Sequence, residues 1–282
     1  MGGIESGAAL PVIRRARDFH LYTADGRRLL DLYLDGGAAL LGHRPALLGR
    51  ELKNVLGRGL TGNLPSVHGA RLIRILRRLL PGHTWFGIAA SADDAWRLLR
   101  GRVNGLPATL REVADPLCDC HWQEAAVAWW RPLCEQQPFG GGWLESGPAA
   151  LLHRLPFRIG AGPVTVSTRE PGEAGADCHA AGNVSPLLLS GAAAALGRLA
   201  RAAPQRLAAA AQWPPEQGAW RRNGIYVTGD YPRGRHAAVH AAFLDAGVLL
   251  NPDHAGPNVL PGIASPGEWQ LLKRLLAAHP GA

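Results

Sequence analysis

The segment from Asp18 to His43 places the strongest constraint on the fold of this chain. It reads DFHLYTADGRRLLDLYLDGGAALLGH, with Asp25-Gly26 between two runs of apolar residues. Asp-Gly in that setting is the strongest short-range signal for a β-hairpin, because the turn needs residues that tolerate positive φ. We therefore predict strands over 21–22 and 29–34, joined by a tight turn and followed by a glycine-rich bend at Gly36-Gly37.

Apolar residues recur at helical or strand spacing in most later segments. We predict helices over 45–60, 69–80, 91–100, 186–203, 204–213, 236–246 and 266–278, and strands over 83–89, 127–130 and 224–229. The interval from 104 to 147 gives no clear pattern apart from the strand at 127–130 and a glycine run near its end.

Length and composition indicate a globular protein. The chain has 282 residues, of which 47% are hydrophobic and 18% are charged, so it can form one large domain or two smaller ones. No apolar run reaches the roughly 18 residues that a membrane-spanning helix needs. The first residues do not have the basic-then-apolar pattern of a secretory signal, so we expect a cytoplasmic protein.

The formal charge of +8 and the sequence pI near 10.0 raise the question of a nucleic-acid partner. Only Lys53 and Lys273 are lysines, which leaves 28 arginines among the 30 basic residues (30 minus 2). The arginines are spread along the chain, without the interleaved aromatics that form stacking platforms. A nucleic-acid partner is therefore not expected, although an arginine-rich nucleic-acid- or protein-binding scaffold stays open as an alternative.

The cysteines and histidines predict no metal site. Cys118 and Cys120 form a C-x-C pair, which lacks the C-x-x-C geometry of a zinc knuckle. His236 and His240 have the four-residue spacing that metalloproteases use for zinc, but the glutamate of that motif is missing. We expect these two histidines to face solvent.

Several motifs, taken in order along the chain, resemble the class III aminotransferases and above all the glutamate-1-semialdehyde aminomutases. The hairpin is followed by Leu41-Gly42-His43, and the segment 243–252 reads FLDAGVLLNP, close to the F-L-E-x-G-V-L-L-P-P of these enzymes. The resemblance covers roughly residues 10–100 and 151–278. It implies a homodimer with a reduced α/β fold of the fold-type I pyridoxal phosphate (PLP) enzymes.

The resemblance also implies how the domains are divided. A reduced large domain, with a central mixed sheet and helices, is expected over 63–200. A small α+β domain is expected from both ends of the chain, over 1–62 and 201–282.

The phosphate-binding turn of this family has changed in this chain. The family's N-S-G-T/S-E-A corresponds to Ala90-Ser91-Ala92-Asp93-Asp94-Ala95, so two carboxylates stand where the resemblance places a phosphate. Carboxylates are good helix caps but poor phosphate ligands. The family threonine that contacts the neighbouring subunit's cofactor corresponds to Ala181. The resemblance leaves as candidate cleft residues Gly36, Gly37, Ser91, Asp93, Asp94, Asn183 and Ser185.

The catalytic lysine of the family has no counterpart. The segment 151–166, LLHRLPFRIGAGPVTV, resembles only the stretch after that lysine, and a Schiff base requires a primary amine. No aspartate closes a buried strand to pair with the pyridinium nitrogen. We therefore assign no catalytic, cofactor-binding or metal-binding residue, and expect no cofactor, with PLP as the ancestral candidate.

These absences favour a pseudoenzyme, an aminotransferase-like protein that binds a small metabolite or a protein partner. An active PLP-dependent transaminase or aminomutase with an unconventional site, using Lys273 or an unrecognised element, is the alternative. The sequence leaves open whether the chain is an enzyme.

Overall fold

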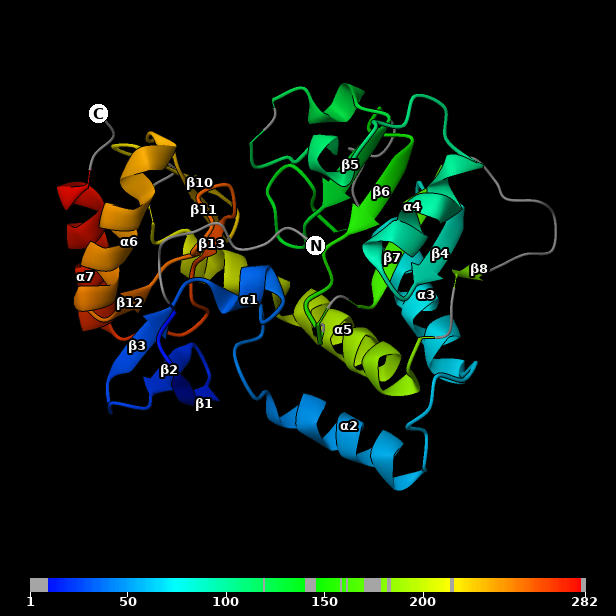
Figure 1. Cartoon of the computed structure of the whole chain (residues 1–282), viewed down its shortest axis with the longest axis horizontal. Coiled ribbons are helices and arrows are strands. Elements are labelled where there is room, and N and C mark those ends of the chain that lie inside the picture. The colour runs from blue at the N-terminus through cyan, green and yellow to red at the C-terminus, as the bar shows by residue number, and fades with distance from the viewer. Residues whose placement is uncertain are drawn as a thin grey trace. The chain divides into compact units, whose positions relative to one another are not determined.

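The structure is a computed structural model that describes residues 10–118, 120–139, 146–157, 159–160, 162–169, 179–181, 184–213 and 216–279 (Figure 1). Its contacts divide the chain into two units. Unit 1 comprises Met1–Pro45 and Ala202–Ala282, and unit 2 comprises Ala46–Arg201. Unit 1 thus contains both ends of the chain. The division differs from the expected boundary at residue 62 by one helix, α2 (Ala46–Gly57), which belongs to unit 2.

The first sheet of unit 1 contains the predicted hairpin. Its strand order is β1-β2-β3-β12, formed by β1 (Ile13–Arg17), β2 (His20–Thr23), β3 (Arg28–Asp31) and β12 (Val248–Leu249). The first three strands are antiparallel neighbours, and β12 pairs with β3 in parallel. Between β2 and β3, Gly26 adopts a φ of +90°, which a residue with a Cβ rarely adopts. The predicted turn is therefore confirmed.

The bend after β3 depends on the carboxylate of Asp31. Its Oδ1 accepts hydrogen bonds from the backbone N–H groups of Tyr33 (2.8 Å) and Leu34 (3.0 Å), and its Oδ2 lies 2.7 Å from Nε2 of His43. These bonds turn the chain into the short helix α1 (Leu34–Gly37). The predicted strand end at Leu34 was wrong, and β3 ends at Asp31.

The Leu-Gly-His motif closes this bend by a backbone bridge. The N–H of Asp18 donates to the carbonyl of His43 (3.0 Å), and the N–H of His43 donates to the carbonyl of Asp18 (2.5 Å). A Cβ on Gly42 would lie 2.7 Å from that Asp18 oxygen, and the φ of Gly42 is +80°. Glycine is therefore required here by close approach as well as by backbone conformation.

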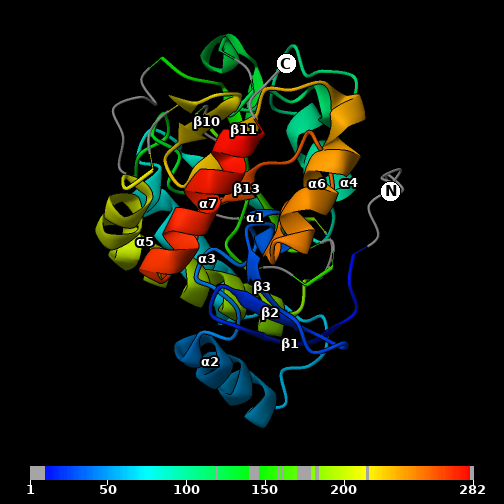
Figure 2. The same cartoon turned by 90° about the vertical axis from the view of Figure 1, so that its left-hand side faces the viewer.

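The second sheet of unit 1 is antiparallel, with the order β13-β11-β10-β9. Its strands are β9 (Glu216–Gln217), β10 (Trp220–Asn223), β11 (Tyr226–Gly229) and β13 (Asn258–Val259). The helices α6 (His236–Asp245) and α7 (Pro266–Ala278) run beside each other (Figure 2). A capping box between Ser265 and Glu268 fixes the start of α7, at the residue predicted from the sequence.

Unit 2 contains a mixed sheet with the order β5-β6-β7-β4-β8 (Figure 1). Its strands are β4 (Trp85–Ala89), β5 (Val127–Trp130), β6 (Ala150–His153), β7 (Val164–Thr168) and β8 (His179–Ala181). The pairs β5/β6 and β4/β8 are parallel, whereas β7 runs antiparallel to both β6 and β4. Short 3-10 turns lie at Leu110–Glu112 and Trp122–Glu124 in unit 2 and at Arg233–Arg235 in unit 1.

Helices cover both faces of this sheet. Alternate residues of β4 point to opposite faces, as in any strand: Phe86 and Ile88 pack in one core, and Trp85 and Ala89 in another. The first core includes apolar residues of α3 (Val67–Leu79) and α5 (Pro186–Ala210), and the second includes those of α4 (Ala92–Arg100). Unit 2 is thus an α/β arrangement in which every residue of β4 is buried.

Helix α5 is longer than predicted. The sequence suggested one helix over 186–203 and another beginning at Pro204, a residue that lacks the N–H used in a helix interior. The structure has one helix of 25 residues with Pro204 inside it. Among the described residues, no helix combines the length and apolar character needed to cross a bilayer.

Candidate functional site

The turn from β4 to α4 and the segment before α5 start from neighbouring strands. Ala89 of β4 lies opposite Ala181 of β8 in a parallel register, and parallel neighbours leave a sheet at the same edge. The ends of β4 and β8 therefore lie at one edge of the unit 2 sheet, and Ser91 follows β4 at this edge. Asn183, another candidate cleft residue, lies outside the described residues.

Side chains of this chain already occupy the start of α4. The Ser91 Oγ accepts a hydrogen bond from the N–H of Asp94 (3.1 Å) and donates one to its Oδ2 (2.7 Å). The Oδ1 of Asp94 accepts from Arg97 Nη1 at 2.7 Å, and the adjacent Asp93 is exposed. This is an ordinary N-cap with two carboxylates in the first turn, where they complement the helix dipole. A dianionic phosphate would be repelled there, so these residues do not fit the phosphate of PLP.

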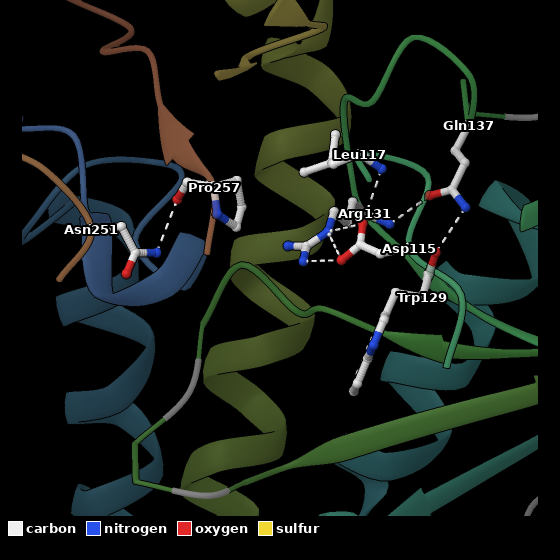
Figure 3. A network of polar contacts seen from close by, with 7 residues as sticks. All are labelled: Asp115, Leu117, Trp129, Arg131, Gln137, Asn251 and Pro257. Carbon is white, nitrogen blue, oxygen red and sulfur yellow. Dashed lines mark hydrogen bonds and ion pairs between the residues drawn. The ribbon is translucent and has the colours of Figure 1, made fainter. Parts of the chain in front are cut away.

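The end of strand β5 carries a positive charge. Arg131 follows β5 and is buried, with its Nε 2.8 Å and 3.0 Å from the two carboxylate oxygens of Asp115 (Figure 3). Gln137 holds the same loop by accepting from the N–H of Arg131 (2.7 Å) and donating to the carbonyl of Trp129 (2.8 Å). The family resemblance places an aspartate at the end of such a strand for the pyridinium nitrogen. Here an arginine follows β5, and the neighbouring carboxylate of Asp115 is already paired with that arginine, so this position does not fit PLP either.

Neither lysine lies in a buried setting. Lys53 is an exposed residue of α2, and Lys273 is an exposed residue of α7. They belong to different units. An amine that forms a Schiff base at neutral pH is usually activated by burial or by a neighbouring cation. Both lysines are exposed, so burial does not activate either of them.

The remaining candidate cleft residues, Gly36 and Gly37, lie in unit 1. Their φ values are +63° and +86°, so they are needed for the bend that follows Asp31. Gly37 also packs near Tyr226, whose ring atom Cε1 would lie 3.9 Å from an added Cβ. These glycines therefore have a structural reason that is independent of any ligand.

The expectation that His236 and His240 face solvent was wrong. Both are buried, because α6 packs them inside unit 1. The ring of His236 lies 3.0 Å from the Tyr231 hydroxyl and 3.0 Å from the carbonyl of Asn251, one contact at each ring nitrogen. Within the described ranges, no three His, Cys, Asp or Glu side chains are grouped so that they could hold a metal ion.

Asn251 fixes the loop that follows the FLDAGVLLNP motif. Its Nδ2 donates to the carbonyl of Pro257 at 3.1 Å (Figure 3), and its backbone N–H donates to the Oδ1 of Asn258 at 2.7 Å. Its Oδ1 accepts from the N–H of Asp253 (3.0 Å). The asparagine in this motif is therefore explained by loop closure.

The sequence did not indicate a cavity that lies between α2 and α3. Its volume is about 350 Å³, and it is lined by Glu51, Asn54, Val55, Arg58, Val67, His68 and Arg71. His68 is only 7% exposed, yet neither of its ring nitrogens has a hydrogen-bond partner within the described parts of the chain. The same holds for the hydroxyl of Ser66, which precedes α3. Helix α3 begins at Val67, two residues before the predicted start, and this places His68 in its first turn.

The charges around this cavity are unequal. Glu51 forms an ion pair with Arg71 and accepts a hydrogen bond from Ser190 (3.1 Å). Burial acts to raise the pKa of Glu51, but the hydrogen bonds from Arg71 and Ser190 outweigh it and lower that pKa below its usual value. Burial lowers the pKa of His68, and the charges of Arg71 and Arg58 lower it further against the opposing effect of Glu51. His68 is therefore a neutral imidazole near pH 7.

Sequence comparisons connect the chain to proteins of unknown function. No family model matches it. An uncharacterized protein of Treponema pallidum (strain Nichols) is 28% identical over 285 residues, which cover 88% of each chain. An uncharacterized protein of Borreliella burgdorferi is 48% identical over 67 residues, or 24% of this chain and 25% of that protein.

Structural comparisons find aminotransferases. An omega-transaminase from Sphaerobacter thermophilus matches with a TM-score of 0.64 and 14% identity, covering 98% of this chain and 92% of that one. A glutamate-1-semialdehyde aminomutase from Pseudomonas aeruginosa PAO1 matches with a TM-score of 0.65 and 15% identity, covering 98% and 88%. The acetylornithine aminotransferase of Elizabethkingia anophelis gives a TM-score of 0.63 at 13% identity, covering 98% and 95%. The chain therefore has an aminotransferase-like α/β fold, and this likeness concerns the fold alone.

Proposed function

We propose that this chain is an aminotransferase-fold protein that no longer holds PLP on a lysine and that acts by binding a small molecule or a protein partner. The observation that carries the proposal is the setting of the lysines. The whole sequence contains only Lys53 and Lys273, and both are exposed residues of helices. The expected homodimer and cytoplasmic location stay predictions.

Two further features support the proposal. At the start of α4, Ser91 and Asp94 bond to each other, and two carboxylates stand where the family holds a phosphate. At the end of β5, Arg131 is paired with Asp115. The three features affect three different contacts of the cofactor, and each would weaken its binding on its own.

Reductive trapping tests this proposal. The full chain is incubated with one equivalent of PLP, reduced with borohydride, digested and analysed by mass spectrometry. We expect adducts on Lys53 and Lys273 to stay far below one per chain, as for any exposed amine. The visible absorbance spectrum recorded before reduction provides a second measurement.

The variants Lys53→Arg and Lys273→Arg are the matched controls, because each removes one primary amine and keeps its charge. One adduct per chain on a single lysine, lost in the corresponding variant, would contradict the proposal and favour the active enzyme with an unconventional site. Weak labelling that is divided between the two lysines would support it.

A further inference from the structure

We propose that the cavity between α2 and α3 binds a small molecule through its phosphate group. The residues that line the cavity include neither Ser91 nor either lysine. The proposal therefore stands independently of whether PLP reacts with the chain. It rests on the charge of the cavity wall, on the start of helix α3 and on the buried ring of His68.

The cavity wall carries an excess of positive charge. Arg58 and Arg71 contribute two positive charges and Glu51 one negative charge. Arg71 is 47% exposed and already paired with Glu51, but a guanidinium has five N–H donors and can serve a second oxyanion. The guanidinium of Arg58 has neither a hydrogen bond nor an ion pair to the described part of the chain. Arg58 is thus available to pair with an anion in the cavity.

The first turn of α3 adds backbone donors to this wall. Val67 and His68, the first two residues of this 13-residue helix, line the cavity. Ser66 has the extended conformation of an N-cap, but its side chain forms no capping hydrogen bond, and the first turn contains no acidic residue. The N–H groups at a helix start are orphan donors at the positive end of the helix dipole, and these receive no help from the Ser66 hydroxyl. The N–H of Gly69 donates to the carbonyl of Ser66 (3.3 Å), and the N–H groups of Val67 and His68, which have no partner among the described residues, are free to bind an anion.

His68 independently indicates a ligand. Its side chain lines the cavity and is more than nine-tenths buried, with both ring nitrogens unsatisfied among the described residues. A buried polar group without a partner costs about 1–3 kcal/mol. Because both ring nitrogens are shielded from solvent in this structure, a ligand oxygen would accept a hydrogen bond from the imidazole N–H once the ring turns toward the cavity.

The number of donors favours phosphate over carboxylate. Two guanidinium groups, an imidazole and the helix start come from separate parts of the wall, and a phosphate offers more acceptor oxygens than a carboxylate does. The volume of about 350 Å³ is at the lower end of the range of small-molecule sites, roughly 300–1,000 Å³. It exceeds what a phosphate group fills, so the ligand class is a small phosphorylated molecule.

Titration of the full chain with inorganic phosphate tests the site, with sodium chloride used to hold the ionic strength constant. Calorimetry gives the affinity, and ¹H–¹⁵N spectra of the histidine side chains report on His68, whose signal is assigned with His68→Gln. We expect saturable binding that shifts the His68 signal. Arg58→Ala should weaken phosphate binding at least tenfold, because it removes the uncommitted guanidinium.

Arg50→Ala is the matched control, since Arg50 is an exposed residue of α2 that does not line the cavity. It should change the affinity less than twofold. Equal weakening by both variants would overturn the proposal, because it would show attraction to net charge alone. Absence of saturable binding, or acetate binding as tightly as phosphate, would overturn it as well. Thermal melts of both variants check the fold. It should stay intact, because each substitution replaces an exposed arginine.

Discussion

Helices α3 and α4 of unit 2 begin alike and differ in what surrounds their first turns. Each is preceded by a serine in an extended conformation, with φ/ψ of −144°/160° at Ser66 and −140°/168° at Ser91. The Ser91 side chain caps its helix, and Asp93 and Asp94 stand in the first turn. Ser66 makes no such bond, and its helix starts beside a cavity lined by arginines and His68.

The difference shows that side chains decide whether a helix start can hold an anion. The backbone makes both starts positive. At α4, Asp93 and Asp94 already supply negative charge to the first turn. At α3, the first turn contains no acidic residue, and the cavity beside it is lined by two arginines and one glutamate. Two helix starts in one unit thus have the same backbone conformation at the preceding serine and opposite charges in the side chains around them.

The largest expected effect is a loss of stability in acid. It is measured first, because the two helix starts can be compared at low pH only while the chain stays folded. His83 lies between α3 and β4, and burial together with the charge of Arg169 lowers its pKa to about 4. Above pH 6.5 the ring is neutral in both the folded and the unfolded chain. As the pH falls from 6.5 to 4 the unfolded chain binds the proton first, so stability falls by about 3 kcal/mol.

Urea denaturation at pH 7 and pH 4 measures this loss. His83→Leu should remove about 3 kcal/mol of the pH-dependent part and leave the contribution of other buried histidines, such as His153, whose pKa burial also lowers. An unchanged pH dependence in His83→Leu would show that this histidine does not titrate as proposed. The variant's stability at pH 7 separates the packing effect from the titration.

The next effect compares the two serines directly. Ser91→Ala removes a capping bond and should lower the free energy of unfolding by about 1 kcal/mol. Ser66→Ala removes a hydroxyl that makes no cap, so its cost should stay below about 0.5 kcal/mol. Chemical denaturation of the two variants measures both values. Equal costs would mean that the two helix starts do not differ as described.

The smallest effect changes the charge of the α2–α3 cavity. Glu51→Gln removes the only carboxylate among its lining residues, and the charge should rise from +1 to +2. Phosphate should then bind about threefold more tightly, a modest gain because the site is open to solvent. Calorimetry at low and moderate salt measures the gain, and Glu124→Gln, at an exposed glutamate outside the cavity, is the control. Equal gains in the two variants would contradict the cavity as the binding site.

The sequence predicted the local elements well, because their signals are local. The Asp25-Gly26 turn, the start of α4 at Ser91 and the full length of α7 all depend on residues a few positions apart. Three local predictions were wrong: β3 ends at Asp31, α3 begins at Val67, and α5 continues through Pro204.

The parts that depend on distant residues could not be predicted. Burial of His236 depends on Tyr231 and on the carbonyl of Asn251, which approach it only in the folded unit. The α2–α3 cavity likewise joins Arg58 to His68 across a loop, and no spacing rule connects an arginine and a histidine ten positions apart. A serine followed by a histidine and an arginine at the start of a helix was the available signal, and by itself it is weak.

Because unit 1 contains both ends of the chain and unit 2 is one stretch between them, the two units make unequal demands on protein engineering. Unit 2 can be encoded by a single open reading frame that begins near Ala46. Unit 1 requires a new covalent junction between Pro45 and the second half of α5. A circularly permuted gene whose new ends lie inside unit 2 would join the two segments of unit 1 into one stretch of chain. The folding of unit 1 could then be measured directly.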